Sequence, residues 1–122
     1  MCEITDIKSF DKIKRLYIND DYIIIDIPSI AFDEWDIKKG MQIDIDIYEE
    51  KPILKNNKKN KLEMFGYIFK RFENYSFFSA GGFLAKLPSS YNIDSSLYII
   101  ISENNASDKD GDKKSKRVRI KQ

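Results

Sequence analysis

Strand-forming residues are densest between Leu62 and Leu87, a stretch that holds half of the chain's Phe, Tyr and Trp residues. Aromatic and β-branched side chains fit a pleated, half-buried surface, so this composition predicts strands rather than helices. The polar pair Glu73 and Asn74 divides the stretch into two runs of about twelve residues, which predicts one long antiparallel hairpin.

Glycines interrupt both runs, with Gly66 in the first and the pair Gly81 and Gly82 in the second. Two such strands would each span about 40 Å, more than a small domain is wide, so both have to bend. Glycine within a strand marks a bulge, a barrel corner or a close approach of backbone. Glycine could also simply be tolerated at these positions, but interruptions in both strands favour a sheet that curls into a closed or nearly closed barrel.

Shorter runs of strand formers flank this hairpin. They are Ile13–Ile18, Asp21–Ile27, Met41–Tyr48 and Leu97–Glu103, preceded by a short apolar start at Ile4 and Ile7. Asn19 and Asp20 predict a tight turn between the first two runs. Isoleucine alternates strictly with polar residues in the third run, which predicts a strand with one buried face.

The connection Ser29–Lys39 follows Pro28 and is expected to be a loop or one short helical turn. We interpret Trp35 there as a cap on the barrel rather than a ligand contact. With six or seven strands at short spacing and no long helix, the sequence predicts an all-β antiparallel barrel of the oligonucleotide/oligosaccharide-binding (OB) type.

The chain has 122 residues and a formal net charge of +1, which hides an uneven distribution. Residues 104–122 carry a balance of +4 with very few apolar side chains, whereas residues 1–103 carry −3. We therefore expect one barrel domain over residues 1–103 and a disordered basic tail over 104–122.

The chain contains no histidine and one cysteine, Cys2. Histidine is the side chain whose unperturbed pKa best suits proton transfer near neutral pH, so an enzyme is the least favoured class, and no cofactor or metal is expected. The start of the chain has no apolar run like that of a signal peptide, and no stretch is long and apolar enough to span a membrane, so we expect a soluble protein in a reducing compartment.

Two lysine-rich segments are candidates for electrostatic contacts. Glu49–Lys61 carries five lysines and is expected to be a long solvated surface loop, although a nucleic-acid contact is conceivable there. Lys113, Lys114, Lys116 and Arg117 fit a nuclear-import signal, a pattern of low specificity that also occurs in solubilising tails.

Six sequence blocks carry a resemblance to a known family. They are Ser9–Leu16, Asp21–Ile27, Gly40–Ile47, Met64–Lys70, Ser79–Leu87 and Leu97–Ile101. In this order they resemble the conserved blocks of the small shared subunit numbered eight in eukaryotic RNA polymerases I, II and III. The most specific part is an aromatic-Gly-x-aromatic strand followed by Ser-x-Gly-Gly-hydrophobic-Leu-x-basic-Leu. The resemblance covers roughly residues 3 to 103.

The resemblance implies a Greek-key β-barrel similar to a pair of joined OB folds, without a catalytic centre. It also implies a structural subunit in the nucleus that docks on the flank of the polymerase, chiefly against the largest subunit. Among the matching positions, those expected to contact the partner are Tyr67, Gly81, Gly82, Phe83 and Lys86. Nucleic acid would be contacted at most indirectly, and no homo-oligomer is expected.

A different class of protein shares part of the pattern. Swapped-hairpin transcription factors of the AbrB/MazE kind are dimeric DNA binders. Their chain has a strand, an Ile-Pro pair, a short helix, a glycine and a second strand in that order, and the same order occurs in Ile25–Ile47. DNA binding needs cations on the docking strands, whereas this region is rich in aspartate. The pattern also leaves the aromatic stretch unexplained, so this alternative is less favoured.

A third alternative is a free-standing module that binds single-stranded nucleic acid. Five aromatic residues of the central hairpin could form a stacking platform: Phe65, Tyr67, Phe69, Phe77 and Phe78. We favour core packing as the explanation for these five.

Overall fold

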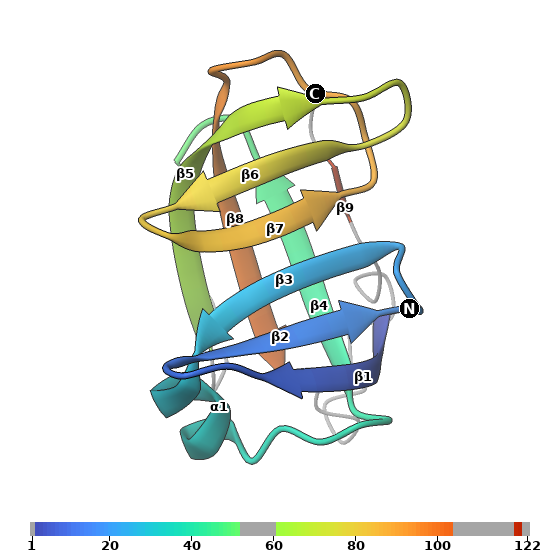
Figure 1. Ribbon diagram of the computed structural model, residues 1–122, viewed down its shortest axis with the longest axis vertical. Coiled ribbons are helices and arrows are strands. Elements are labelled where there is room, and N and C mark those ends of the chain that lie inside the picture. The colour runs from blue at the N-terminus through green and yellow to red at the C-terminus, as the bar shows by residue number, and fades with distance from the viewer. Residues whose placement is uncertain (1, 52–60, 104–118, 121–122) are drawn as a thin grey trace, which may run out of the picture.

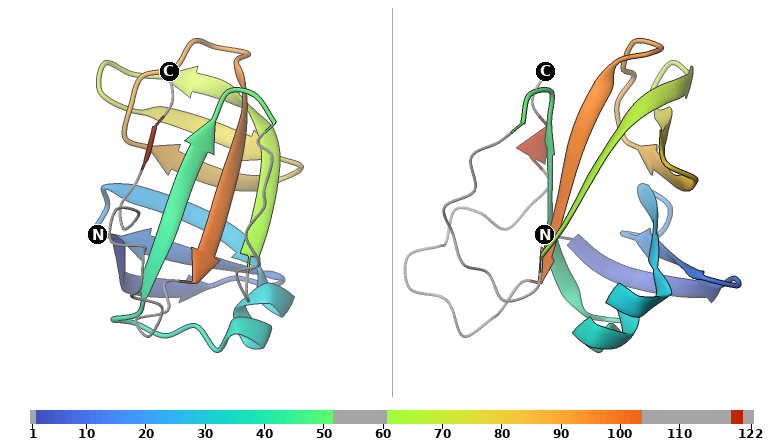
Figure 2. Two further views of the ribbon diagram at one scale, coloured as in Figure 1. Left: turned by 180° about the vertical axis from the view of Figure 1, so that it is seen from behind. Right: turned by 90° about the vertical axis from the view of Figure 1, so that its left-hand side faces the viewer.

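The computed structural model describes residues 2–51, 61–103 and 119–120. Its elements are β1 (Cys2–Ser9), β2 (Ile13–Ile18), β3 (Ile23–Pro28), α1 (Ser29–Trp35), β4 (Gln42–Tyr48), β5 (Lys61–Arg71), β6 (Ser76–Ala80), β7 (Phe83–Leu87), β8 (Ser96–Glu103) and β9 (Arg119–Ile120). In Figure 1, β4, β5 and β8 run along the long axis of the molecule, and β1–β3 with β6–β7 run across it; Figure 2 shows the two groups as opposite sides.

Eight strands close into one antiparallel ring in the order β1-β2-β3-β7-β6-β5-β8-β4, and β4 pairs back onto β1. The closing contact is short, since it joins only Cys2 to Ile43 and Glu3 to Gln42. The predicted all-β antiparallel barrel is therefore confirmed, although the ring is uneven.

The strand order contains the Greek-key arrangement twice. In the second half, β5, β6 and β7 pair in sequence and β8 returns to lie beside β5; in the first half, β1, β2 and β3 do the same and β4 returns beside β1. The halves meet at two joints. The β4–β8 joint has six residue pairs, from Ile43↔Glu103 to Tyr48↔Tyr98, whereas the β3–β7 joint has two, Ile24↔Lys86 and Ile25↔Ala85.

Isoleucines from alternate strand positions fill the ring. Ile43, Ile45 and Ile47 of β4 are buried side by side, as their alternation predicts. Phe78 of β6 is the largest fully buried side chain among the described residues. Because inward side chains of the eight ring strands meet in one cluster, the barrel has a single packed core.

The helix α1 closes one end of the ring (Figure 1). Pro28, with extended backbone, precedes its first turn, and Asp36 ends it in the left-handed conformation. Trp35 on the last turn is buried in the core cluster. The predicted short helical connection and the capping position of Trp35 are both confirmed.

The prediction of one long hairpin is wrong in its second half. Gly81 and Gly82 have φ values of 61° and 97° and form a two-residue turn between β6 and β7, with Ala80 paired to Phe83. Two successive positive φ values suit a tight hairpin connection, which follows the twist of the flanking strands. The glycine pair therefore reverses the chain instead of bending one strand.

Gly66 does mark a bend. A Cβ built on Gly66 would collide with the backbone carbonyl of Ser79 on the neighbouring strand β6. The pairing of β5 with β6 also shifts register between Ile68 and Lys70. Close backbone approach and a bulge together let β5 pass from the long side of the ring to the crossing side.

Three further sequence predictions concern the turn after β2, the first strand and the end of the chain. The chain turns at Asn19 and Asp20 as predicted, with φ values of 52° and 66°, but the turn extends through Tyr22 and the next strand begins at Ile23 rather than Asp21. The sequence showed only an apolar start where the structure has the full strand β1. Arg119–Ile120, within the segment expected to be disordered, instead pairs in parallel with β4; the rest of that segment lies outside the described residues.

The swapped-hairpin alternative finds no support in this arrangement. The residues that carried its pattern form β3, α1 and β4, and the two strands lie apart in the ring, β3 between β2 and β7 and β4 between β8 and β1. Both strands already pair on each side with strands of the same chain.

Candidate interaction surface

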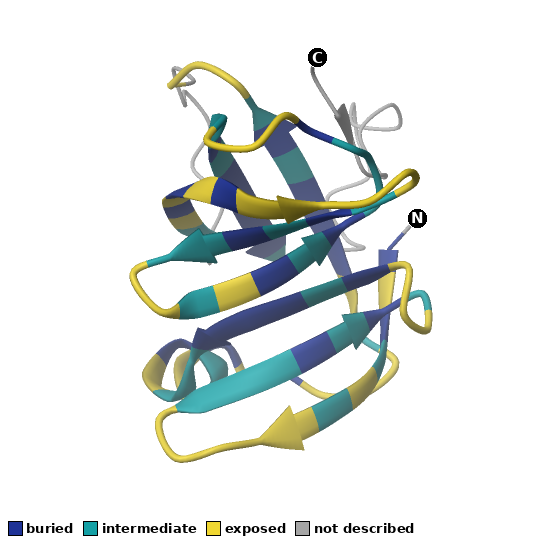
Figure 3. Cartoon of the chain, turned by 45° about the horizontal axis from the view of Figure 1, so that its top comes forward, coloured by how far each residue is buried: buried dark blue, intermediate teal, exposed yellow. Residues whose placement is uncertain are grey.

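The outer face of β5 carries three aromatic side chains in a row. Phe65, Tyr67 and Phe69 are 43%, 52% and 50% exposed, while Ile68 between them is buried. Strand alternation sends them to the solvent side, visible in Figure 3 as alternating buried and exposed bands along β5. Core packing, favoured from the sequence, is therefore wrong for these three residues and right for Phe78.

The exposed rings belong to two groups. In the first, the ring of Phe65 lies 5.3 Å from that of Tyr67 and 4.6 Å from that of Tyr98 on β8. The second group, named here the aromatic cluster, lies where β5 turns into β6 and consists of Phe69, Phe72, Tyr75 and Phe77.

The rings of the aromatic cluster hold one another in fixed orientations. Phe72 and Tyr75 stack at 4.6 Å with 20° between their planes. Phe77 stands edge-on to both, at 5.8 and 5.7 Å and 88°. Phe69 stacks on Phe77 at 6.2 Å. Such pairs add about 0.5–1.5 kcal/mol each beyond the buried area, so the four rings stabilise one another's positions.

Two lysines border the aromatic cluster, and Arg71 lies next to Phe72 in the sequence. The ammonium of Lys70 lies 5.5 Å from the ring of Phe72, and that of Lys86 lies 4.9 Å from the ring of Tyr75. Lys86 also donates a hydrogen bond to the backbone carbonyl of Asp21 at 3.0 Å. Arg71 donates to the neutral side chains of Ser90 and Asn92 at 3.0 and 3.1 Å.

Within the described part of the chain, no carboxylate forms an ion pair with Lys70, Arg71 or Lys86. Among residues 2–51 and 61–103, the ion pairs join Arg15 to Asp26, Lys38 to Asp36, Lys39 to Asp6 and Lys51 to Glu63. Lys70 and Lys86 therefore place positive charge beside the aromatic rings.

The structure brings together only some of the residues predicted to contact a partner. Tyr67 is paired with Ser79, close to the exposed turn Gly81–Gly82, so these three share one end of the β6–β7 hairpin. Lys86 lies near the other end, opposite Phe77. Phe83 is half-buried and packs against the core, so its side chain does not face outward.

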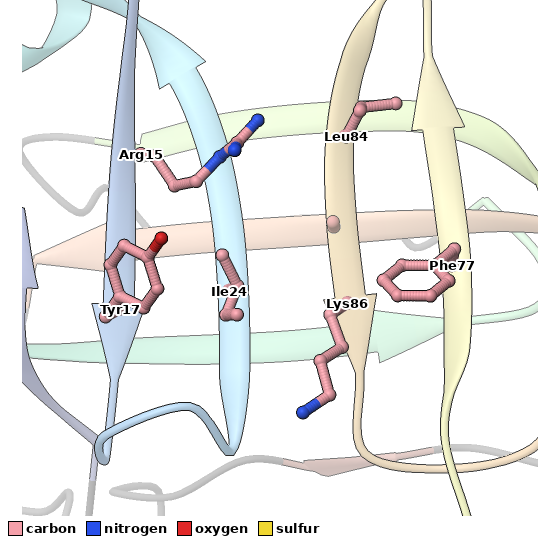
Figure 4. Close-up of a pocket in the computed structure, with 7 residues that line it drawn as sticks. Arg15, Tyr17, Ile24, Phe77, Leu84 and Lys86 are labelled. Atoms are coloured by element: carbon pink, nitrogen blue, oxygen red, sulfur yellow. The ribbon is translucent and has the colours of Figure 1, made fainter. Parts of the chain in front are cut away.

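A shallow groove of about 160 Å³ lies over the β3–β7 joint. Figure 4 shows its lining side chains, which come from β2, β3, β6 and β7: Arg15, Tyr17, Ile24, Phe77, Leu84 and Lys86. Sequence reasoning missed this groove because it depends on which strands become neighbours. Its cationic and aromatic side chains are far apart in the sequence. They come together only because β2, β3, β7 and β6 are neighbours in the sheet.

A buried carboxylate holds the joint beneath the groove. Asp26 accepts hydrogen bonds from Arg15 at 2.6 and 3.0 Å and from the backbone N–H of Leu84 at 3.2 Å. The side chain thus satisfies a donor on β7 just beyond the last ladder pair. The hydrogen bond to Asp26 raises the pKa of the Arg15 guanidinium above its ordinary value, against the opposing effect of burial.

The proposed import residues, Lys113, Lys114, Lys116 and Arg117, lie outside the described residues. Within the described part of the chain, no three side chains among His, Cys, Asp and Glu come together as a metal site. Its helix is too short to cross a membrane.

The comparisons with known proteins leave the family open. No protein-family model matches the chain, and no curated protein sequence matches it either.

Proposed function

We propose that this chain is a non-catalytic structural subunit of a DNA-directed RNA polymerase, which docks on the largest subunit and supports assembly of the enzyme. The observation that supports this proposal is that the two most specific sequence blocks of the resemblance are neighbours in the fold. Residues 64–70 and 79–87 lie in the adjacent strands β5, β6 and β7, and their most distinctive positions surround one exposed hairpin turn.

The docking surface is the turn end of this hairpin, formed by Tyr67, Gly81 and Gly82. Tyrosine is enriched among residues that dominate protein interfaces, because a rigid ring gives a large contact area at low entropic cost. The two glycines let a partner's backbone approach the turn closely, since no side chain stands in the way. A turn fixed by the flanking ladder needs little ordering on binding.

The chain's chemistry fits a subunit without its own reaction. It contains no histidine, and the shallow groove at the β3–β7 joint is lined by no carboxylate of the described residues. Asp26, buried nearby, is already bonded to Arg15 and Leu84. We extend the proposal to the nucleus on the basis of Lys113, Lys114, Lys116 and Arg117.

Affinity purification of the tagged full chain from its native host tests this proposal. The largest polymerase subunit should be recovered in fixed stoichiometry. Tyr67→Ala should reduce that recovery, whereas Phe10→Ala, which removes a similarly exposed ring at the β1–β2 connection, should leave it unchanged. Recovery of a homodimer without polymerase subunits would contradict the proposal.

A further inference from the structure

The aromatic cluster is distinct from the turn proposed to dock on the polymerase. It lies at the start of β6, whereas Gly81 and Gly82 follow the end of the same strand. Phe69 and Phe72 leave 50% and 37% of their surface in solvent. Contiguous apolar rings that stay partly exposed are typical of interaction surfaces.

The charges around the cluster decide what it binds. The ammonium groups of Lys70 and Lys86 lie beside the rings, and Arg71 directly precedes Phe72 in the sequence. The acidic residues nearby are Glu73, which follows Phe72, and Asp21, whose backbone carbonyl accepts a hydrogen bond from Lys86. Lysine is depleted in the cores of protein interfaces, so a protein partner would have to desolvate these cations against its apolar contacts. Aromatic rings beside cations suit single-stranded nucleic acid, because its bases stack on the rings and its phosphates are attracted by the cations.

The ring geometry favours stacking as well. Phe72 and Tyr75 already form a parallel pair, and Phe77, standing edge-on, keeps both in place. A base that stacks on this pair extends an existing stack and orders no further side chain. A duplex keeps its base faces covered by neighbouring base pairs, so the rings can be used only by a single strand.

We propose that the aromatic cluster binds single-stranded nucleic acid, with bases stacked on Phe69 and Phe72 and phosphates attracted by Lys70, Arg71 and Lys86. Arg15, in the neighbouring groove, does not contribute charge because Asp26 neutralises it. The proposal concerns the isolated chain and stands independently of polymerase docking.

The test is a fluorescence anisotropy titration of a short labelled oligothymidylate with the full chain. Binding should weaken between about 50 and about 200 mM salt, as phosphate contacts require. Phe69→Ala and Phe72→Ala should each weaken it by about fivefold or more, the loss expected for one stacked base. Phe10→Ala is the matched control, since its ring is 48% exposed and lies in the β1–β2 connection.

Lys70→Gln provides a second readout that leaves the rings intact. It should lower the magnitude of the logarithmic salt slope by about 0.7, the value for one phosphate contact on a single strand. The proposal is overturned if the ring variants and Phe10→Ala bind equally, if the slope is unchanged in Lys70→Gln, or if duplex of the same length binds as tightly as the single strand. Loss of polymerase recovery in Phe72→Ala without oligonucleotide binding by the original chain would also overturn it and identify a protein interface.

Discussion

Replacing Gly66 by alanine tests the close approach that lets the ring close. The new Cβ would collide with the carbonyl oxygen of Ser79 and would lie 2.7 Å from its carbonyl carbon and 2.9 Å from the Cα of Ala80. All three atoms are backbone, so no rotamer change can move them aside. Strand β6 would have to shift away from β5 at the point where Tyr67 pairs with Ser79.

The cost of this shift can be estimated. Overpacking a well-packed site costs about 1–3 kcal/mol, and a clash with fixed backbone belongs at the upper end. Alanine recovers about 0.4–1 kcal/mol by reducing the freedom of the unfolded chain. We therefore expect Gly66→Ala to lower the free energy of unfolding by about 2 kcal/mol or more, a large part of the 5–15 kcal/mol typical of a small domain.

Urea titration of the full chain measures this loss, provided that the slope m stays constant. Gly40→Ala is the control, because Gly40 has a φ of 90° but no atom within 4 Å of its would-be Cβ. It should show only backbone strain, about 1–2 kcal/mol for a left-handed residue, partly offset by the same unfolded-state gain. A loss in Gly66→Ala no larger than that in Gly40→Ala would refute the close-approach argument.

Three further predictions concern the hairpin turn, a buried tyrosine and the end of the chain. Gly81→Asn should cost little, because asparagine is well suited to this position of a two-residue hairpin turn, whereas Gly81→Val should cost about 1–2 kcal/mol and Ser79→Val less, as measured by urea titration. Burial raises the pKa of Tyr91 to about 12 from 10.0, and its hydroxyl has no hydrogen-bond partner among the described residues. The stability that the neutral Tyr91 contributes should therefore be fully present below pH 10.0 and be lost as the pH rises toward about 12. Tyr91→Phe should make the fall in the free energy of unfolding over this pH range smaller, and it should raise that free energy by about 1 kcal/mol at neutral pH. Deleting residues 104–122 should leave thermal unfolding cooperative, because it removes β9 but none of the eight ring strands, and it should reduce nuclear accumulation in cells; loss of cooperativity would mean that the domain extends beyond residue 103.

Local patterns in the sequence sufficed for most individual strands. The alternating isoleucines of β4 and the Asn19–Asp20 turn carry their structure within a few residues, so they could be predicted without knowledge of the neighbours. The Gly81–Gly82 pair could not be assigned in the same way. Strand formers continue on both sides of it, and a bend and a reversal use glycine for the same conformational freedom.

The direction of the aromatic side chains was beyond a single-strand pattern. Phe65, Tyr67 and Phe69 occupy alternate positions, and so do Met64, Gly66 and Ile68 between them. Either set could face the core by hydrophobicity alone, and the aromatic set has the larger side chains. Gly66 determines which set faces the core, because the backbone of β6 passes too close to it for any side chain. That approach joins Gly66 to Ser79, more than ten positions away, so it could not be seen in the pattern of one strand.

The unequal joints between the two Greek-key halves explain why the outer surface carries its features where it does. At the β4–β8 joint, six residue pairs hold the strands together along their length. At the β3–β7 joint, the ladder ends after two pairs and Asp26 replaces it with a side-chain bond to Leu84, so the strands separate and a groove opens on the outside. Phe77 and Lys86 line this groove and also belong to the aromatic cluster or border it. The groove exists because the β3–β7 ladder stops after two residue pairs. An apolar residue in place of Asp26 could not accept the hydrogen bond from the Leu84 N–H that the shortened ladder leaves free.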